Sequence, residues 1–103
     1  MRQFDVFPNP SPKSRAIAPF LVLMQSHFLE EMPTALIAPL LQIPESEAPT
    51  RVSLRIDFRG SILHLSLAEM APIRRSELKR AAGDLRSHEF DIRRALDRLF
   101  TGF

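Results

Sequence analysis

The most regular stretch of the sequence runs from Arg51 to Arg59, where large apolar residues alternate with polar or charged ones. Such alternation places the apolar side chains on one face of an extended strand and the polar ones on the other. Gly60 follows directly, and leucines at 63, 65 and 67 resume the alternation. We therefore predict an antiparallel β-hairpin that buries one face and turns at residues 59–61.

Three other stretches are typical of strands. Phe4 and Val6 alternate with polar neighbours within residues 2–7, and a proline-rich segment then ends the pattern. Residues 20–24 are apolar without alternation, as in a strand covered on both faces. Residues 34–41 are also apolar, but Pro39 cannot donate a hydrogen bond to a neighbouring strand, so we expect an edge position or a bend there.

The C-terminal segment has the pattern of an amphipathic helix. We expect Ser87 to cap its N-terminus and Glu89 to pair with Arg93 one turn along. Segment 76–82 has helix-forming composition but lies between a proline and a glycine, so a short helix and an irregular crossing both stay open. The apolar stripe of the C-terminal helix consists of Ile92, Ala95, Leu96, Leu99 and Phe103.

Several antiparallel strands followed by one helix predict an α+β domain, with the helix packed on a strongly curved sheet. The chain has 103 residues, the length of one domain, which we place at residues 1–103. The sequence contains no cysteine, so disulfides and thiolate sites are excluded. Because neither an export signal nor an uninterrupted apolar span is visible, we expect a cytoplasmic protein without membrane contact.

The histidines and glycines give no sign of a catalytic or metal site. His27, His64 and His88 stand far apart, without the spacing of metal ligands, and we expect each to be structural or solvent-facing. The three glycines are too scattered to form a phosphate-binding loop. We therefore expect no catalytic residue, no metal and no cofactor.

A row of arginines follows the polar face of the predicted hairpin strand. Guanidiniums at positions 51, 55 and 59 could contact RNA phosphates, but no aromatic residue lies between them to stack on bases. We therefore favour a solvated face, paired with Asp57 or Glu69.

Four large apolar residues stand where solvent-facing residues are usual. Phe28 and Leu29 follow a polar bend, and Phe100 and Phe103 lie at the end of the predicted helix. Each alone is best explained by packing onto the core. Together, with Gly102 at the helix end, the C-terminal aromatics fit a protein-binding epitope.

Five segments follow one another in a characteristic order and cover almost the whole chain. They are Pro19 to Leu29 with its Gln25-Ser26 bend, Thr34 to Leu40 ending in Pro-Leu, Leu67 to Ala71, Leu85 with Ser87-His88, and Asp91 to Phe103. In this order and spacing the sequence resembles the CcdB family of bacterial toxins. The resemblance implies an SH3-like barrel, or strongly curved antiparallel β-sheet, with a C-terminal α-helix.

The resemblance also implies a function. Members are homodimeric toxins of type II toxin–antitoxin pairs that serve plasmid maintenance. They bind the A subunit of DNA gyrase, poison this topoisomerase without being enzymes, and are neutralised by a CcdA-like antitoxin. No specific DNA binding is expected without the antitoxin, and its site on the toxin stays unassigned. Carried onto this sequence, the gyrase contacts fall on Phe28, Leu29, Asp97, Phe100, Thr101, Gly102 and Phe103.

Two positions depart from the well-studied plasmid toxin of the family. Thr101 stands where that toxin has a tryptophan, and Asp97 stands where it has an asparagine. Loss of a tryptophan removes a large anchor of the kind that dominates interface energetics. Two alternatives to gyrase poisoning therefore stay open: a ribosome-independent mRNA endonuclease on the same barrel, using the arginine face and His64, and a homologue that only binds its antitoxin.

Overall fold

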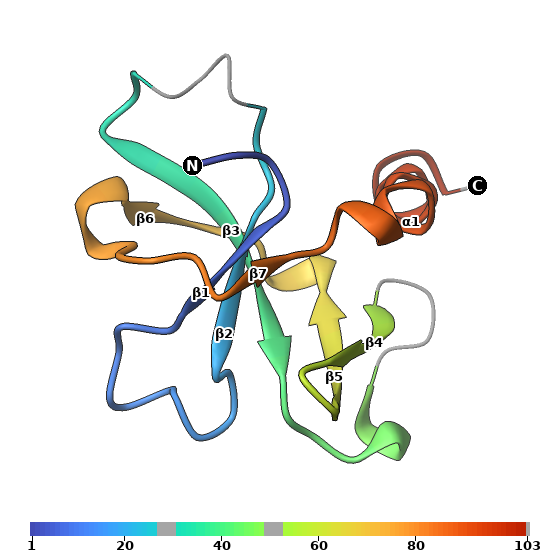
Figure 1. Cartoon of the computed structure of the whole chain (residues 1–103). Helices are drawn as coiled ribbons and strands as arrows, with labels where there is room; N and C mark the ends of the chain where they lie inside the picture. The colour runs from blue at the N-terminus through green and yellow to red at the C-terminus, as the bar shows by residue number, and fades with distance from the viewer. Residues whose placement is uncertain (27–30, 49–52, 103) are drawn as a thin grey trace.

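The computed structural model describes residues 1–26, 31–48 and 53–102. Within them, seven strands form one antiparallel sheet, and a helix follows the last strand (Figure 1). The elements are β1 (Asp5–Pro8), β2 (Phe20–Leu23), β3 (Thr34–Leu41), β4 (Ser53–Phe58), β5 (Ser61–Ser66), β6 (Ala71–Arg74), β7 (Gly83–Asp84) and α1 (Glu89–Thr101).

The sheet is strongly curled, and its two ends approach each other. The strand order is β4-β5-β3-β2-β1-β7, with β6 paired to a separate part of β3. At the ends of this path, the Phe58 ring of β4 lies so close to β7 that a Cβ on Gly83 would stand 3.0 Å from it. Arg59 donates a hydrogen bond to the carbonyl of Ala82 at 2.7 Å, close to the same contact. The architecture is the expected α+β, SH3-like fold.

The predicted hairpin is confirmed. β4 pairs with β5 in register from Ser53↔Ser66 to Phe58↔Ser61, which leaves Arg59 and Gly60 as a two-residue turn. Both turn residues have positive φ, 54° and 80°. This is the geometry of a type I′ turn, whose twist matches that of the strands it joins.

Strand β1 departs from the predicted alternation. Phe4 and Val6 pack in the main apolar cluster inside the curled sheet, whereas Phe7 belongs to a second cluster on the other side. Asp5 lies between them and is only 8% exposed, because Arg86 forms an ion pair with it at 3.1 Å. The strand is thus covered on both faces, and a paired carboxylate replaces the solvent-facing residue that we expected.

Of the two possibilities expected at Pro39, an edge position or a bend, the edge position is wrong. β3 pairs with β2 on one side, from Leu23↔Ile37 to Phe20↔Leu40. On its other side, β6 pairs with residues 34–37 and β5 with residues 40–41. Pro39 therefore lies in the gap between two successive partners, where the lack of an N–H donor interrupts neither pairing.

Of the two structures left open for segment 76–82, the irregular crossing is the one observed. β6 ends at Arg74, a 3₁₀ turn follows at Arg75–Glu77, and the chain continues without a regular element to β7. Leu78 is 4% exposed and packs in the second cluster. This one buried side chain anchors the crossing, a tertiary contact that local composition does not show.

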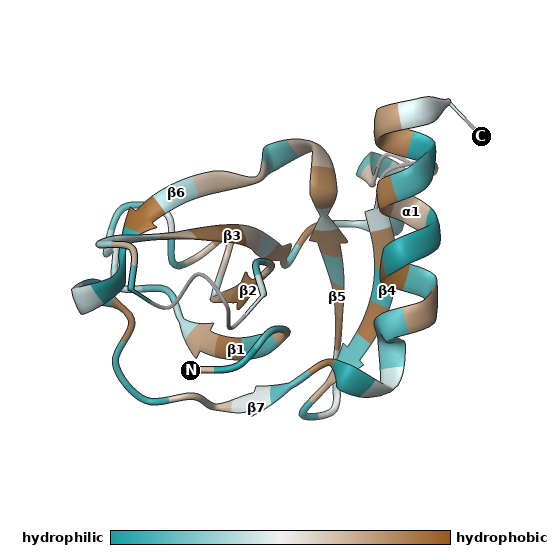
Figure 2. Ribbon diagram, turned by 90° about the horizontal axis from the view of Figure 1, so that it is seen from above, coloured by the Kyte–Doolittle hydropathy of each residue, from teal (hydrophilic) through white to brown (hydrophobic). Residues whose placement is uncertain are grey.

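Helix α1 lies alongside β4 (Figure 2). Ile92 and Ala95 are fully buried in the main cluster, and Leu96 and Leu99 pack against it, as the apolar stripe predicts. The expected cap at Ser87 is wrong by one residue, because a 3₁₀ turn at Arg86–His88 precedes the helix and His88 takes the cap position without a side-chain hydrogen bond.

Candidate protein-binding site on the C-terminal helix

The last turn of α1 presents an aromatic side chain to solvent. Phe100 is 73% exposed on the flank of the apolar stripe by which the helix packs on the sheet. Gly102 ends the helix in the left-handed conformation with φ 79°, and its N–H donates to the carbonyl of Arg98 at 3.0 Å. Thr101 donates from its hydroxyl to the carbonyl of Asp97 one turn earlier. Four of the predicted contact residues lie within the described chain, and all four are exposed at the glycine-capped end of α1. They are Asp97, Phe100, Thr101 and Gly102.

A second exposed aromatic residue, which the sequence did not single out, lies near the start of the same helix. Phe90 is 70% exposed, and the guanidinium of Arg94 lies over its ring at 5.8 Å from the centroid. At about 100° per residue, Phe90 points away from the stripe that contains Ile92 and Leu99. The signal was present in the sequence: a phenylalanine opposite an apolar helical stripe has no place in the core.

The comparison with protein families agrees with this geometry. The family model described as CcdB protein matches residues 3–102, which is nearly the whole chain and includes the helix through its glycine cap. The chain belongs to the CcdB family. It is therefore the toxin component of a toxin–antitoxin system, and its family implies an antitoxin partner. No curated protein matches the chain.

The remaining predicted contacts of the CcdB-family toxin lie outside the described residues. They are Phe28, Leu29 and Phe103. The structure describes the Gln25-Ser26 bend before the first two, where the Gln25 side-chain oxygen accepts a hydrogen bond from the backbone N–H of Leu36 at 2.9 Å. The bend is thus tied to β3.

The arginine row predicted on the hairpin makes structural contacts. Arg55 pairs with Glu45 at 3.4 Å, and not with either of the partners that we expected for the row, Asp57 or Glu69. Arg59 lies 5.7 Å from the centre of the Phe58 ring and also bonds to the backbone next to β7. Arg51 lies outside the described residues. These contacts hold the guanidiniums against the protein rather than presenting them as one phosphate-binding surface.

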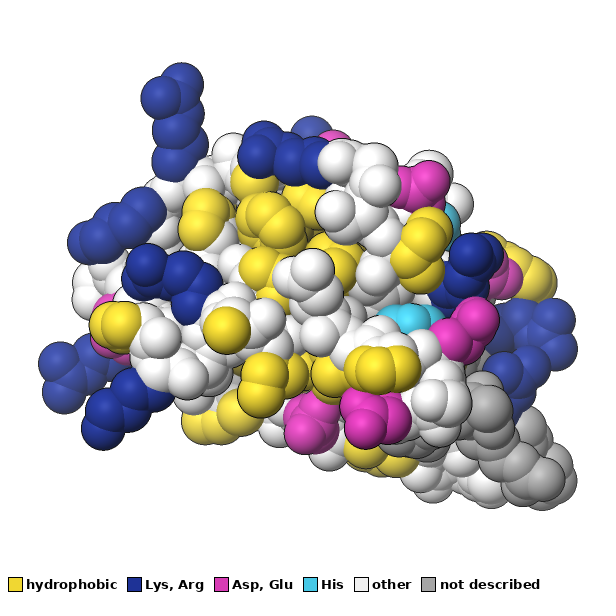
Figure 3. Space-filling view, turned by 90° about the horizontal axis from the view of Figure 1, so that it is seen from below, with side chains coloured by type: hydrophobic (Ala, Val, Ile, Leu, Met, Phe, Trp, Pro, Cys, Tyr) yellow, Lys and Arg dark blue, Asp and Glu magenta, His cyan; other side chains and the backbone are white. Residues whose placement is uncertain are grey.

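Lys and Arg side chains also lie away from the hairpin. Figure 3 shows several Lys and Arg side chains around the end of the molecule opposite α1. Because β4 lies beside α1, these cations are not the arginine row. His64 lies beside Arg55 and Glu45 at a small open pocket of about 180 Å³, but only 4% of it is exposed, so little of its side chain can reach a substrate.

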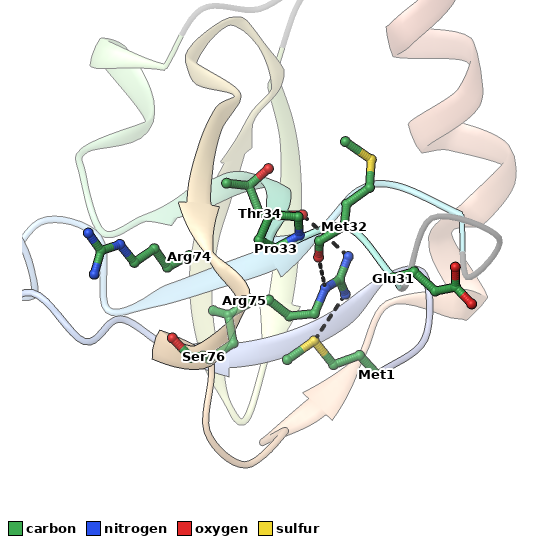
Figure 4. Close-up of a pocket in the computed structure, with 9 residues that line it drawn as sticks. Met1, Glu31, Met32, Pro33, Thr34, Arg74, Arg75 and Ser76 are labelled. Carbon is green, nitrogen blue, oxygen red and sulfur yellow. Dashed lines mark hydrogen bonds between the residues drawn. The ribbon is translucent and has the colours of Figure 1, made fainter.

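An open groove of about 810 Å³ lies beside the 3₁₀ turn that follows β6. Arg75 donates hydrogen bonds to the carbonyls of Met32 at 3.0 Å and Thr34 at 3.4 Å, and approaches the Met1 sulfur, whereas Arg74 points to the other side of the strand (Figure 4). The Arg75 guanidinium at this groove is therefore bound to the protein itself. This groove shows no arrangement of an acid and a base suited to catalysis.

Neither a metal site nor a membrane span occurs within residues 1–26, 31–48 and 53–102. No group of His, Asp and Glu side chains in these ranges is arranged to hold a metal ion. No helix among them combines the length and the apolar composition needed to cross a membrane.

Proposed function

We propose that this CcdB-family toxin binds the A subunit of DNA gyrase through the C-terminal end of α1 and poisons the enzyme. It acts stoichiometrically, as a cytoplasmic homodimer of single-domain chains spanning residues 1–103, and a CcdA-like antitoxin neutralises it. It has no catalytic activity and needs no cofactor. In the cell, such a pair would serve plasmid maintenance.

The exposure of Phe100 is the observation that carries this proposal. An aromatic ring that is 73% exposed on a helix loses little conformational freedom when a partner covers it, because the helix is already fixed by its buried side. Aromatic side chains dominate the energetics of protein interfaces. The glycine cap ends the helix directly after this ring, which leaves room for a partner around the helix terminus.

Thr101 and Asp97 change what a partner meets at this end. Threonine offers far less apolar surface than the tryptophan of the well-studied plasmid toxin, and Asp97 brings a charge that a partner must pair or leave hydrated. Phe100 therefore carries a larger share of the binding at the helix end in this protein. We expect Phe28, Leu29 and Phe103 to contact the same partner.

A binding and cleavage assay tests the proposal. The purified chain is titrated onto a fragment of the gyrase A subunit, and intact gyrase is then incubated with supercoiled DNA and the chain. We expect stoichiometric binding and an accumulation of gyrase-cleaved DNA. Ile17→Ala serves as the control, because Ile17 is 60% exposed on the loop between β1 and β2, outside α1. Absence of both signals at micromolar concentration would exclude this mechanism.

The two alternatives have tests of their own. Burial of His64 argues against an mRNA endonuclease, and we expect a synthetic RNA to stay intact after prolonged incubation with the chain. Cleavage that His64→Ala abolishes would reverse that expectation. Growth arrest on expression without antitoxin is expected for a toxin, and normal growth would indicate a homologue that only binds its antitoxin.

A further inference from the structure

Phe90 has no role in holding the fold together. Its side chain is 70% exposed, and it belongs to neither apolar cluster. The neighbouring helix positions that face the sheet, Ile92 and Ala95, are at most 1% exposed. One exposed apolar side chain needs no explanation by itself, but Phe90 and Phe100 are both at least 70% exposed on the same helix, and a contact with another molecule accounts for both.

The position of Phe90 on the helix connects it with the predicted gyrase contacts. Phe90, Arg94, Asp97 and Thr101 are spaced by four, three and four residues along α1. This spacing places them in one line along the helix, the arrangement that a packed partner element contacts along its length. The line extends for about 16 Å at the helical rise of 1.5 Å per residue. Asp97 and Thr101 form its C-terminal half, and Phe90 and Arg94 its N-terminal half.

The local contacts hold this line in a defined shape. Arg94 lies 5.8 Å from the centre of the Phe90 ring, and Arg93 pairs with Glu89 at 3.0 Å on the adjacent turn. A cation over an aromatic face is attracted to it, which restricts the ring before any partner binds. The surface is therefore preorganised, and a partner that covers it meets a smaller entropic cost.

We propose that Phe90 is a second aromatic anchor for the gyrase A subunit, so that the partner contacts the full solvent-facing line of α1 as well as its C-terminal end. This inference rests on the proposed function. Thr101 supplies little apolar area at one end of the line. Phe90 supplies a whole ring at the other end, which compensates for that small area. The specificity of the toxin would then depend on the start of the helix as much as on its end.

The test compares three variants for binding to the gyrase A fragment by calorimetry. Phe90→Ala should weaken binding about tenfold or more, as expected when an aromatic anchor is truncated. Phe90→Leu, which keeps part of the apolar surface, should recover part of that loss. Ile17→Ala removes an apolar side chain of similar exposure (60%) outside α1 and should bind as the wild type does. The unfolding temperature should be unchanged in all three variants, because the side chains of Phe90 and Ile17 are both mostly exposed.

The outcomes separate the inference from the proposed function. If Phe90→Ala binds gyrase A like the wild type while Phe100→Ala is weakened, the inference is wrong and the proposed function stands. A change in the oligomeric state of Phe90→Ala by light scattering would assign the ring to self-association and also overturn the inference. If the wild-type chain does not bind gyrase A, both fall together.

Discussion

The two faces of helix α1 differ sharply in what they contribute. On one face, Ile92 and Ala95 are at most 1% exposed and pack with the interior of the curled sheet. Outside this face, Phe90, opposite the buried stripe, and Phe100, on its flank, are at least 70% exposed. Apolar residues of the same helix therefore serve two purposes: one set excludes water within the fold, and the other stays available for a partner.

This contrast means that stability and binding can be changed separately. Truncation on the buried face removes contacts from the core and should lower stability. Truncation on the exposed face should leave the folded chain intact and lower only the affinity for its partner. A variant that disturbs both properties would show that the two faces are coupled.

The largest effect is expected for Ile92→Ala. Ile92 is 0% exposed in the main cluster, and a truncation of this kind costs about 3 kcal/mol of unfolding free energy because it leaves a cavity. Urea denaturation followed by circular dichroism measures the loss. Arg94→Ala, at an exposed position on the same helix, is the control and should change stability by less than about 0.5 kcal/mol. A loss below about 1 kcal/mol for Ile92→Ala would contradict the close packing of this side chain in the main cluster.

The sequence predicted the buried face of α1 well and the exposed face poorly. Helical spacing of apolar residues follows directly from the geometry of one buried side, so the pattern alone places Ile92 and Leu99 on that side. Phe100 and Gly102 were singled out by their position at the chain end. The helical pattern does place Phe90 opposite the apolar stripe, but it gives no role for the ring, because the role of an exposed side chain depends on what lies outside the chain.

A similar division holds within the sheet. The β4–β5 hairpin was predictable because its alternation and the Arg59-Gly60 turn are local properties. The partners of β3 were not, since Pro39 is acceptable there only because β6 and β5 pair with different parts of the strand. The burial of Asp5 depends likewise on Arg86, which is far away in the sequence. Contacts between distant segments decide the features that local patterns leave open.

Phe100→Ala should have the largest effect on binding alone. Because the ring is 73% exposed, its removal should leave the unfolding temperature unchanged. Its loss as an aromatic anchor should weaken binding to the gyrase A fragment by about 2 kcal/mol, or about thirtyfold. Calorimetric titration and thermal unfolding of the same preparation check both expectations. Equal affinity of variant and wild type would remove Phe100 from the contact surface.

Gly102→Ala should have an intermediate effect, on both the stability of the helix end and the affinity for gyrase A. Gly102 has φ 79°, a conformation that costs an L-residue about 1 kcal/mol, so the end of the helix should fray in the variant. Hydrogen exchange of the amides in the last turn should rise, and binding should weaken because Phe100 is held less firmly. Gly102→Asn is the matched control, since asparagine tolerates this conformation better than alanine. Identical exchange in the alanine and asparagine variants would show that the cap conformation is unimportant.

The smallest effect is expected for Arg93→Ala on the outer side of the helix. Arg93 and Glu89 form an ion pair at 3.0 Å, one turn apart, with both side chains about half exposed. Such pairs stabilise a helix by about 0.3 kcal/mol at low salt, and the contribution falls as ions screen the charges. Urea denaturation at low and at high salt measures the difference, which should nearly vanish at high salt. A loss that exceeds about 1 kcal/mol, or that does not respond to salt, would mean that Arg93 supports the fold and that the outer side of α1 is less independent of the core than its exposure indicates.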